Sequence, residues 1–257
     1  MKIFYDSQIF NAQVFGGISR YFVRLIENLE SNTKNKIKIG GPTFLNQYLS
    51  EVYLENTKKG TKVGKSLKAP SKILSHLSNH LTCLFSNYDI IHKTYYYPEI
   101  YRPKNAINIL TVYDLIHELF PNDDKNIDKF LKHKKRAISK ADHIICISKK
   151  TKNDLIEVYG VEENRISVIY LGFDDFSLKI KNLKNLPSVN DPRTKYLLYV
   201  GSRIGHKNFK NFIQAFSHLK EQENPYHVLC FGGGGFSKNE IQLFESLKIT
   251  DKVKHTS

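Results

Sequence analysis

The sequence predicts an α/β protein with two Rossmann-like domains, of which the second is incomplete. Short apolar runs alternate with amphipathic helical patterns along the 257 residues. The strand-like runs are continuously apolar, which is typical of parallel sheets covered on both faces. A polar stretch with prolines and little periodicity divides the chain, so we expect domains at residues 1–175 and 195–257 and a linker at residues 176–194. The second domain opens too late to be finished by residue 257.

The first domain is expected to alternate strands and helices. Apolar runs predict strands at residues 2–5, 36–41, 88–92, 106–113, 142–148 and 165–170. Helical spacing predicts helices at residues 18–29, 72–85, 125–141 and 148–159. Residues 42–70 are weakly patterned and lysine-rich toward their end, so we expect a mixture of helix and surface loop there.

Three of these helices carry more specific expectations. The helix at residues 72–85 has an apolar stripe formed by Ile73, Leu74, Leu77, Leu81 and Leu84. The helix at residues 125–141 should expose its basic run at residues 133–136 and bury Ile127, Phe130, Leu131 and Ile138. Ser148 is placed to cap the following helix, and Gly160 to end it.

The second domain begins with an expected strand at residues 195–202 and a helix at residues 208–222. A strand at residues 227–231 runs into four glycines. Ser237 and Glu240 then form a capping box at the start of another helix. A last strand is expected at residues 251–257.

The composition limits the class of protein. No apolar run is long enough to span a membrane, and the N-terminus does not have the pattern of a signal peptide. The three cysteines show no metal-ligand spacing and suggest reduced thiols in the cytoplasm: Cys83, Cys146 and Cys230.

The net charge of +14 allows three interpretations. Lysine can simply be abundant on the surface, or the excess can attract an anionic membrane or a phosphorylated lipid. Nucleic acid ranks third as a partner, because no zinc-finger, RRM or KH-type motif is present and the lysines are spread along the chain.

Ligands of open parallel sheets collect at the carboxyl ends of strands, and the turn after residue 200 is the strongest candidate. Gly201 and Ser202 form the turn, Arg203 and Lys207 are its cations, and Asn208 precedes a helix. Guanidinium and ammonium groups at a helix N-terminus suit a phosphate or diphosphate. The alternative is two surface cations near a turn.

Two glycine pairs are further candidates. Gly16 and Gly17 open a helix, where the backbone can approach an anion closely, although the pair can also be a flexible turn. Gly233 and Gly234 can let a base or ribose lie against the backbone, or they can form only a tight turn.

Polar groups also follow two strands of the first domain. Tyr113, Asp114 and His117 come after one strand and can orient sugar hydroxyls or move a proton. The alternative is a helix start with an Asp cap. At the end of the preceding strand and just after it, four polar rings resemble a carbohydrate-stacking wall: His92, Tyr95, Tyr96 and Tyr97. The alternative is a structural role for the lone histidine.

Together, five segments resemble the GT-B glycosyltransferases of family 4, a group that includes bacterial lipopolysaccharide and capsule mannosyl- and glucosyltransferases. The segments are FGGISRYF at residues 15–22, TVYDLIHELFP at 111–121, ADHIICISKKTKNDL at 141–155, ISVIYLGFD at 166–174 and LLYVGSRIGHKNF at 197–209. The resemblance covers nearly the whole chain.

The resemblance implies a hexosyltransferase that takes mannose or glucose from a nucleotide-diphosphate sugar, with retention of configuration and without a metal ion or other cofactor. Arg203 and Lys207 would hold the diphosphate in a cleft between the domains, and Gly16 and Gly17 would face the donor phosphate and the acceptor. The acceptor would be a glycan or lipid-linked glycan of a cell-surface polysaccharide. The protein would be cytoplasmic, at the inner face of an anionic membrane.

Two departures from the family pattern qualify this interpretation. Tyr113 stands where many members have a histidine that contacts the donor sugar, and His117 is the candidate to replace it. The Glu-x7-Glu motif of the family is expected beyond residue 257. The alternatives are therefore a catalytically impaired, truncated relative acting as a binding module and, second, a basic nucleic-acid-binding protein.

Overall fold

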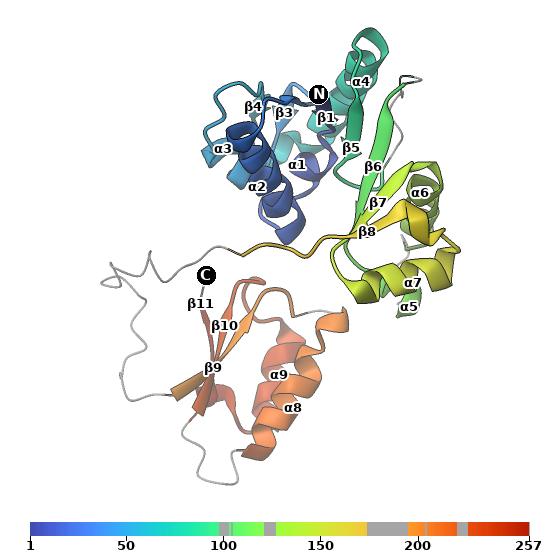
Figure 1. Ribbon diagram of the computed structural model, residues 1–257. Helices are drawn as coiled ribbons and strands as arrows, with labels where there is room; N and C mark the ends of the chain where they lie inside the picture. The colour runs from blue at the N-terminus through green and yellow to red at the C-terminus, as the bar shows by residue number, and fades with distance from the viewer. Residues whose placement is uncertain are drawn as a thin grey trace. The chain divides into compact units, whose positions relative to one another are not determined.

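Parallel strands form the sheets of two separate units, residues 1–172 and 173–257 (Figure 1). The computed structural model describes residues 1–97, 103, 105–120, 127–173, 195–203, 205–219 and 226–256. The expected linker at residues 176–194 lies outside them. Within these ranges no helix is both long and apolar enough to cross a bilayer.

The first sheet has six parallel strands in the order β2-β1-β5-β6-β7-β8. They are β1 (Lys2–Tyr5), β2 (Lys36–Ile39), β5 (Ile90–Lys93), β6 (Ile107–Val112), β7 (His143–Cys146) and β8 (Ile166–Val168). The chain passes from β1 outward to β2 and then returns to β5 on the other side of β1. The carboxyl ends of β1 and β5 therefore form the topological switch point of this sheet.

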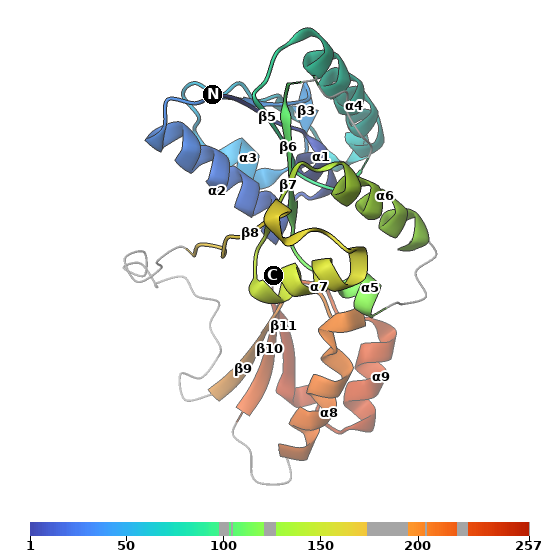
Figure 2. The ribbon, with the colours of Figure 1, turned by 45° about the vertical axis from the view of Figure 1, so that its right-hand side comes forward.

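Helices cover both faces of this sheet (Figure 2). They are α1 (Gln8–Ala12), α2 (Gly17–Asn32), α3 (Gln47–Glu51), α4 (Lys68–Phe85), α5 (Ile116–Leu119), α6 (Ile127–Lys140) and α7 (Lys149–Tyr159). Shorter elements are β3 (Thr43–Phe44), β4 (Thr61–Lys62), η1 (Lys65–Leu67) and η2 (Glu163–Arg165). Helix α1 was not predicted from the sequence, and the weakly patterned residues 42–70 contain β3, α3, β4 and η1.

The alternation of side chains along β1 separates two cores. Tyr5 packs with α2 through Phe22 on one face, whereas Phe4 on the other face packs with Cys83 of α4. A third core joins β6 and β7 to α6 and α7, and Leu110 and Leu155 are fully buried there. The strands are apolar at successive positions because both faces of the sheet are covered.

Helix α4 turns its polar side inward, contrary to the usual arrangement of an amphipathic helix. The buried residues of α4 are Ser71, Ser75, Asn79 and Cys83, whereas its apolar stripe is 46% to 65% exposed. The inward residues are small because α4 passes close to the backbone after β2: a Cβ atom on Gly40 would lie 2.0 Å from Oδ1 of Asn79. The stripe at Ile73, Leu74, Leu77, Leu81 and Leu84 is therefore no part of the core.

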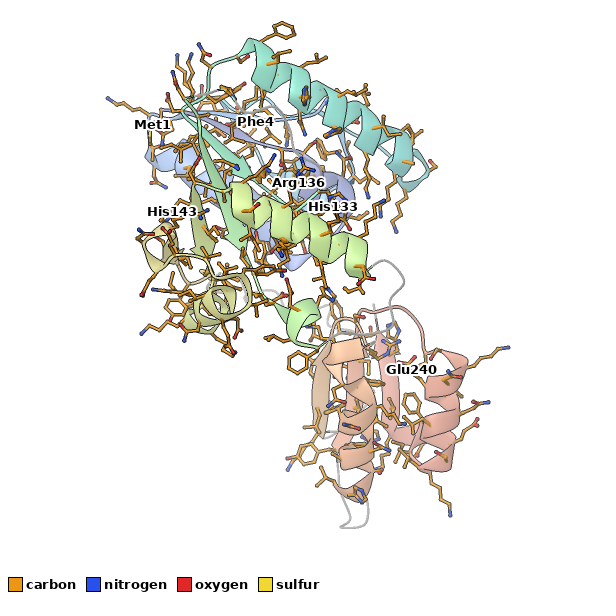
Figure 3. The ribbon with its side chains drawn as sticks, turned by 90° about the vertical axis from the view of Figure 1, so that its right-hand side faces the viewer. Met1, Phe4, His133, Arg136, His143 and Glu240 are labelled. Carbon is orange, nitrogen blue, oxygen red and sulfur yellow. The ribbon has the colours of Figure 1, made fainter. Side chains whose placement is uncertain are left out.

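The basic run of α6 at residues 133–136 was expected to be exposed, and this is wrong for one of its residues. Figure 3 labels His133 and Arg136 in this run. Lys135 and Arg136 are exposed, but Lys134 is only 1% exposed. Its Nζ lies 2.8 Å from Oε1 of Glu118 and donates to the carbonyl oxygen of Asp114 at 2.7 Å. Lys134 can be buried because Glu118 and the carbonyl oxygen of Asp114 satisfy its ammonium group, and the ion pair connects α6 to α5.

The second unit has three parallel strands in the order β11-β10-β9, with two helices packed against one face. Its elements are β9 (Lys195–Val200), η4 (Gly205–Lys207), α8 (Phe209–Leu219), β10 (Tyr226–Phe231), α9 (Lys238–Ser246), η6 (Thr250–Lys252) and β11 (Val253–Thr256). The core is formed by the aromatic residues Phe209, Phe216 and Phe244 against β10.

The predicted helix caps are confirmed. Oγ of Ser148 accepts a hydrogen bond from the backbone N–H of Thr151 at 3.0 Å. Gly160 ends α7 in the left-handed region, at φ 63°. Ser237 and Glu240 form the capping box of α9.

We expect Lys134→Met to lower the free energy of unfolding of the first unit by about 3–5 kcal/mol, because it leaves the carboxylate of Glu118 buried without its cation. Urea unfolding followed by circular dichroism measures this. Lys135→Met, at the exposed neighbour, is the control and should change stability little. Equal effects of the two substitutions would contradict the buried ion pair.

Candidate functional site

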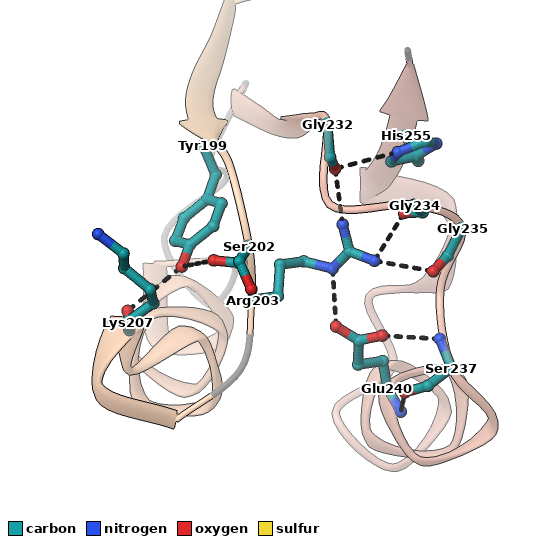
Figure 4. Close-up of polar contacts among 10 residues, drawn as sticks. All are labelled: Tyr199, Ser202, Arg203, Lys207, Gly232, Gly234, Gly235, Ser237, Glu240 and His255. Atoms are coloured by element: carbon teal, nitrogen blue, oxygen red, sulfur yellow. Dashed lines mark hydrogen bonds and ion pairs between the residues drawn. The ribbon is translucent and has the colours of Figure 1, made fainter. Parts of the chain in front are cut away.

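The carboxyl ends of β9 and β10 bring together four of the predicted ligand-binding residues, of which Figure 4 labels Arg203 and Gly234. Gly201 follows β9, and its N–H donates to the carbonyl oxygen of Phe231 at the end of β10 at 2.9 Å. Arg203, Gly233 and Gly234 surround this junction. The parallel pairing of β9 with β10 places both loops at one edge of the sheet.

Arg203 holds the glycine loop after β10 by its guanidinium group. Nη1 donates to the carbonyl oxygen of Gly232 at 3.1 Å, and Nη2 donates to those of Gly234 and Gly235 at 2.8 and 2.9 Å. The ring of Phe236 lies 4.9 Å from Cζ of Arg203. Since the side chain is only 4% exposed, Arg203 is an internal clamp in this structure rather than a surface cation.

Glu240 completes the clamp and connects it to α9. Its Oε1 accepts from Nε of Arg203 at 2.7 Å, and its Oε2 accepts from the backbone N–H of Ser237 at 2.7 Å. Burial raises the pKa of Glu240, but the hydrogen bonds from Arg203 and Ser237 outweigh this effect, so the pKa lies below its usual value. The carboxylate thus links Arg203 to the capping box.

The glycine loop requires glycine for two reasons. Gly232, Gly233 and Gly234 all have φ near +75°, where side chains with a Cβ are strained. A Cβ atom on Gly233 would also lie 2.5 Å from the carbonyl oxygen of Gly201. The loop can therefore lie against β9 only because it lacks side chains.

The other residues predicted after β9 do not join the clamp. Lys207 is exposed, and its ammonium group makes no hydrogen bond or ion pair with a residue that the structure describes. Figure 4 shows Lys207 beside Tyr199, whereas Arg203 extends toward the glycines. Ser202 is exposed, and Asn208 precedes α8 with φ 54°. The two cations expected to act as a pair thus extend in different directions.

The paired glycines of the first unit lie at the N-terminus of α2. Oε1 of Gln13 accepts a hydrogen bond from the N–H of Ser19 at 3.2 Å, so a neutral side chain caps this helix. A Cβ atom on Gly16 would lie 2.1 Å from the same Oε1, whereas one on Gly17 would meet nothing within 4 Å. A side chain at residue 16 would therefore displace the amide of Gln13 from its contact with Ser19, whereas the space at Gly17 is open.

His92 lies in the core at the end of β5. Its Nε2 is 2.9 Å from Oγ1 of Thr111, and its ring centroid is 5.2 Å from that of Phe22. Burial lowers the pKa of His92 to about 3, so the imidazole is neutral at physiological pH. A sugar contact of His92 stays a prediction, and the geometry gives it a packing role.

The residues after β6 divide between the core and the surface. Tyr113 is 9% exposed, and its ring packs edge-on against Tyr21 at 5.8 Å. Burial is the main cause that raises the pKa of Tyr113. Asp114 is exposed, and its Oδ1 accepts a hydrogen bond from the N–H of Ile116, two residues on, at 3.2 Å. Asp114 is the more accessible of the two.

The tyrosines after β5 pack into an aromatic cluster with α6. Phe130 contacts Tyr95, Tyr96 and His117, with ring centroids 6.2, 5.8 and 5.2 Å away. Tyr96 is buried, whereas Tyr95 and His117 are partly exposed. Phe130 thus joins predicted site residues from two loops in one group.

The structure adds polar residues that the sequence reading missed. At the switch point, Asp6 is fully buried and accepts hydrogen bonds from the N–H and the hydroxyl of Thr94. The sequence also did not predict that Gln13 contacts the start of α2 or that Glu240 pairs with Arg203. The position of Glu240 in the first turn of the helix after the glycine loop was the available sign that it could pair with Arg203.

In the ranges that the structure covers, no three His, Cys, Asp or Glu side chains come together as potential metal ligands. The expectation of a metal-independent reaction stays a prediction.

Comparisons with known proteins connect both units to one class of enzyme. The sequence model described as Glycosyltransferase Family 4 matches residues 15–175, and the model described as Glycosyl transferases group 1 matches residues 181–257. The O-antigen chain mannosyltransferase RfbU of Salmonella typhimurium LT2 is 27% identical over 149 residues. That match spans 56% of this chain and 38% of the length of RfbU.

Solved structures are similar over the full chain. Anabaena Alr3699/HepE in complex with UDP-glucose is 16% identical, with a TM-score of 0.60, and the match covers 100% of this chain and 68% of that one. The apo form of the lipopolysaccharide outer core galactosyltransferase WaaB is 17% identical, with a TM-score of 0.56, and the match covers 100% and 69%. These likenesses show an α/β fold of the GT-B type. With the family model matching residues 15–175, the chain belongs to glycosyltransferase family 4.

Proposed function

We propose that this protein is a retaining hexosyltransferase that transfers mannose or glucose from a nucleotide-diphosphate sugar to a glycan or lipid-linked acceptor in cell-surface polysaccharide synthesis. RfbU, a mannosyltransferase of O-antigen chains, and HepE, crystallised with UDP-glucose, support this class of donor and acceptor. The match spans 38% of the length of RfbU, so donor binding and sugar transfer by this chain are both part of the proposal.

One observation carries the proposal: a side-chain-free loop lies at the carboxyl edge of the second sheet. Gly201, Gly233 and Gly234 meet there, next to the start of α8. Open parallel sheets bind ligands at this edge, and glycines allow a flat base or a ribose to approach the backbone.

The two cations have different roles in this proposal. Arg203 is a positioning residue, because its hydrogen bonds to Gly232, Gly234 and Gly235 fix the shape of the loop. Of these two cations Lys207 is the exposed one, at the end of η4 and just before α8, so its ammonium group can approach a diphosphate. A cation at this position would stabilise the leaving diphosphate as its charge develops, without a metal ion.

The first unit would supply the acceptor side. Asp114 has an exposed carboxylate at the carboxyl end of β6, where it can orient a sugar hydroxyl. The exposed parts of Tyr95 and His117 offer rings for stacking beside Phe130. Tyr113 would act from the core, by holding Tyr21 and α2 in place.

Isothermal titration calorimetry with UDP-glucose and GDP-mannose tests the donor. We expect one of them to bind, and Lys207→Ala to weaken that binding roughly ten- to a hundredfold, because a charge-assisted contact is lost. Lys210→Ala changes an exposed lysine at the second residue of α8 and should leave the affinity unchanged. Absence of binding by the unmodified protein would refute the donor assignment.

Transfer is measured separately with the nucleotide sugar that binds and a glycan acceptor. We expect product of retained configuration, and equal rates with and without EDTA. Asp114→Asn should lower the rate at least about tenfold with little effect on donor affinity. Donor binding without any transfer would instead identify a binding module.

We expect Glu240→Gln to destabilise the second unit at pH 7 and to have a smaller effect in acid. The folded pKa of Glu240 is lowered, so its stabilisation is complete above the unfolded value of about 4.3 and is lost as the pH falls through the folded value. Hydrogen exchange of the second unit at pH 7 and near pH 3.5 measures the difference. Glu245→Gln on the exposed side of α9 is the control, and an equal response of both variants would contradict the clamp.

A further inference from the structure

The outward face of α4 is unusually apolar for a surface helix. Ile73, Leu77, Leu81 and Phe85 follow one another at intervals of four residues and form one row along the helix. These four side chains are between 53% and 79% exposed. Leu74 and Leu84 widen the row, and α4 lies on the outer side of its unit in Figures 1 to 3. An exposed apolar surface of this kind marks an interaction site.

A second row of α4 is polar and begins with two lysines. Lys68, Lys72, His76 and His80 also follow at intervals of four, so they lie between the apolar row and the buried row that begins at Ser71. The apolar face is thus flanked on one side by two lysine cations near the start of α4, whereas burial lowers the pKa of His76 further along the row.

The chain around α4 continues this charge. Residues 56–88 contain six lysines, two histidines and no Asp or Glu. Five of the lysines are exposed: Lys58, Lys62, Lys65, Lys68 and Lys72. Lys59 instead donates to the carbonyl oxygens of Leu49 and Val52. A cluster of four to eight cations beside an amphipathic helix is suited to the negative surface of a membrane.

We propose that α4 is a membrane-docking helix, which lies parallel to an anionic bilayer with its apolar row among the acyl chains and its lysines at the lipid phosphates. A second copy of this chain fits the surface less well. A symmetric contact would bring two segments of the same positive charge together, with no carboxylate in residues 56–88 to compensate.

The inverted polarity of α4 supports this assignment independently of charge. The inward row is held by hydrogen bonds: Oγ of Ser75 donates to the carbonyl oxygen of Thr43 at 3.0 Å, and Nδ2 of Asn79 donates to Oγ of Ser7 at 3.0 Å. These bonds fix the orientation in which the leucines face outward. The apolar row is therefore presented by the fold itself.

Vesicle flotation tests the proposal with the full chain. We expect recovery with vesicles that contain phosphatidylglycerol and little recovery with phosphatidylcholine alone. Lys65, Lys68 and Lys72 changed together to Gln should lower partitioning on the order of a hundredfold. The same change of the exposed lysines Lys129, Lys132 and Lys135 on α6 is the control. Equal loss in both variants would show that total charge, not α4, drives binding, and would overturn the proposal.

Fluorescence tests whether the apolar row enters the lipid. The chain has no tryptophan, so Leu77→Trp introduces a single reporter. We expect its emission to shift to the blue on anionic vesicles, while Ile169→Trp, at an exposed site outside α4, should not shift. An equal shift at both sites, or none at residue 77, would overturn the proposal.

Leu77→Ser with Leu81→Ser separates lipid from protein partners. We expect vesicle partitioning to fall at least about tenfold, with unchanged circular dichroism and unchanged sedimentation. A variant that keeps its lipid binding but dissociates from a dimer to a monomer would identify a second copy as the occupant. Nucleotide binding, measured in parallel, should not change, so this proposal and the donor assignment can fail independently.

Discussion

The parallel pairing of the strands is the constraint on which the candidate site depends. Because every strand of a sheet runs the same way, all loops that leave the carboxyl ends gather at one edge. In the second unit this edge receives the turn after β9 and the glycines after β10. One ion pair then completes the arrangement, since Arg203 and Glu240 connect the glycine loop to α9. The backbone pattern brings the loops together, and the guanidinium group holds them there.

Much of this fold follows from local patterns in the sequence. Apolar runs identify the strands, and the caps at Ser148 and Ser237 depend on neighbours three residues away. The orientation of α4 could not be predicted, because it depends on contacts with Gly40 and Thr43, which are distant in sequence. A stripe of apolar residues shows that a helix is amphipathic, but not whether the stripe packs on the core or lies on the outer surface.

The same limit applies to single charged residues. Arg203 and Lys134 look like surface cations in the sequence, yet each is nearly buried against a carboxylate far along the chain. The candidate edge and its glycines were predictable, because glycines and strand ends are local features. The different environments of Arg203 and Lys207 were not predictable, because only the folded structure brings Arg203 to Glu240 and leaves Lys207 exposed. Spacing in the sequence therefore indicated which loops share the candidate edge, but not which side chain of each loop is buried.

The polar inner row of α4 has a consequence for how this surface changes over evolution. Hydrogen bonds are directional, so rotation of α4 by one residue would separate Ser75 and Asn79 from Thr43 and Ser7 and leave polar groups unpaired. An apolar seam would tolerate such rotation more easily. The helix is therefore locked in register, and substitutions on its outer side can retune that surface without disturbing the packing beneath it. The outer side and the core are free to diverge at different rates.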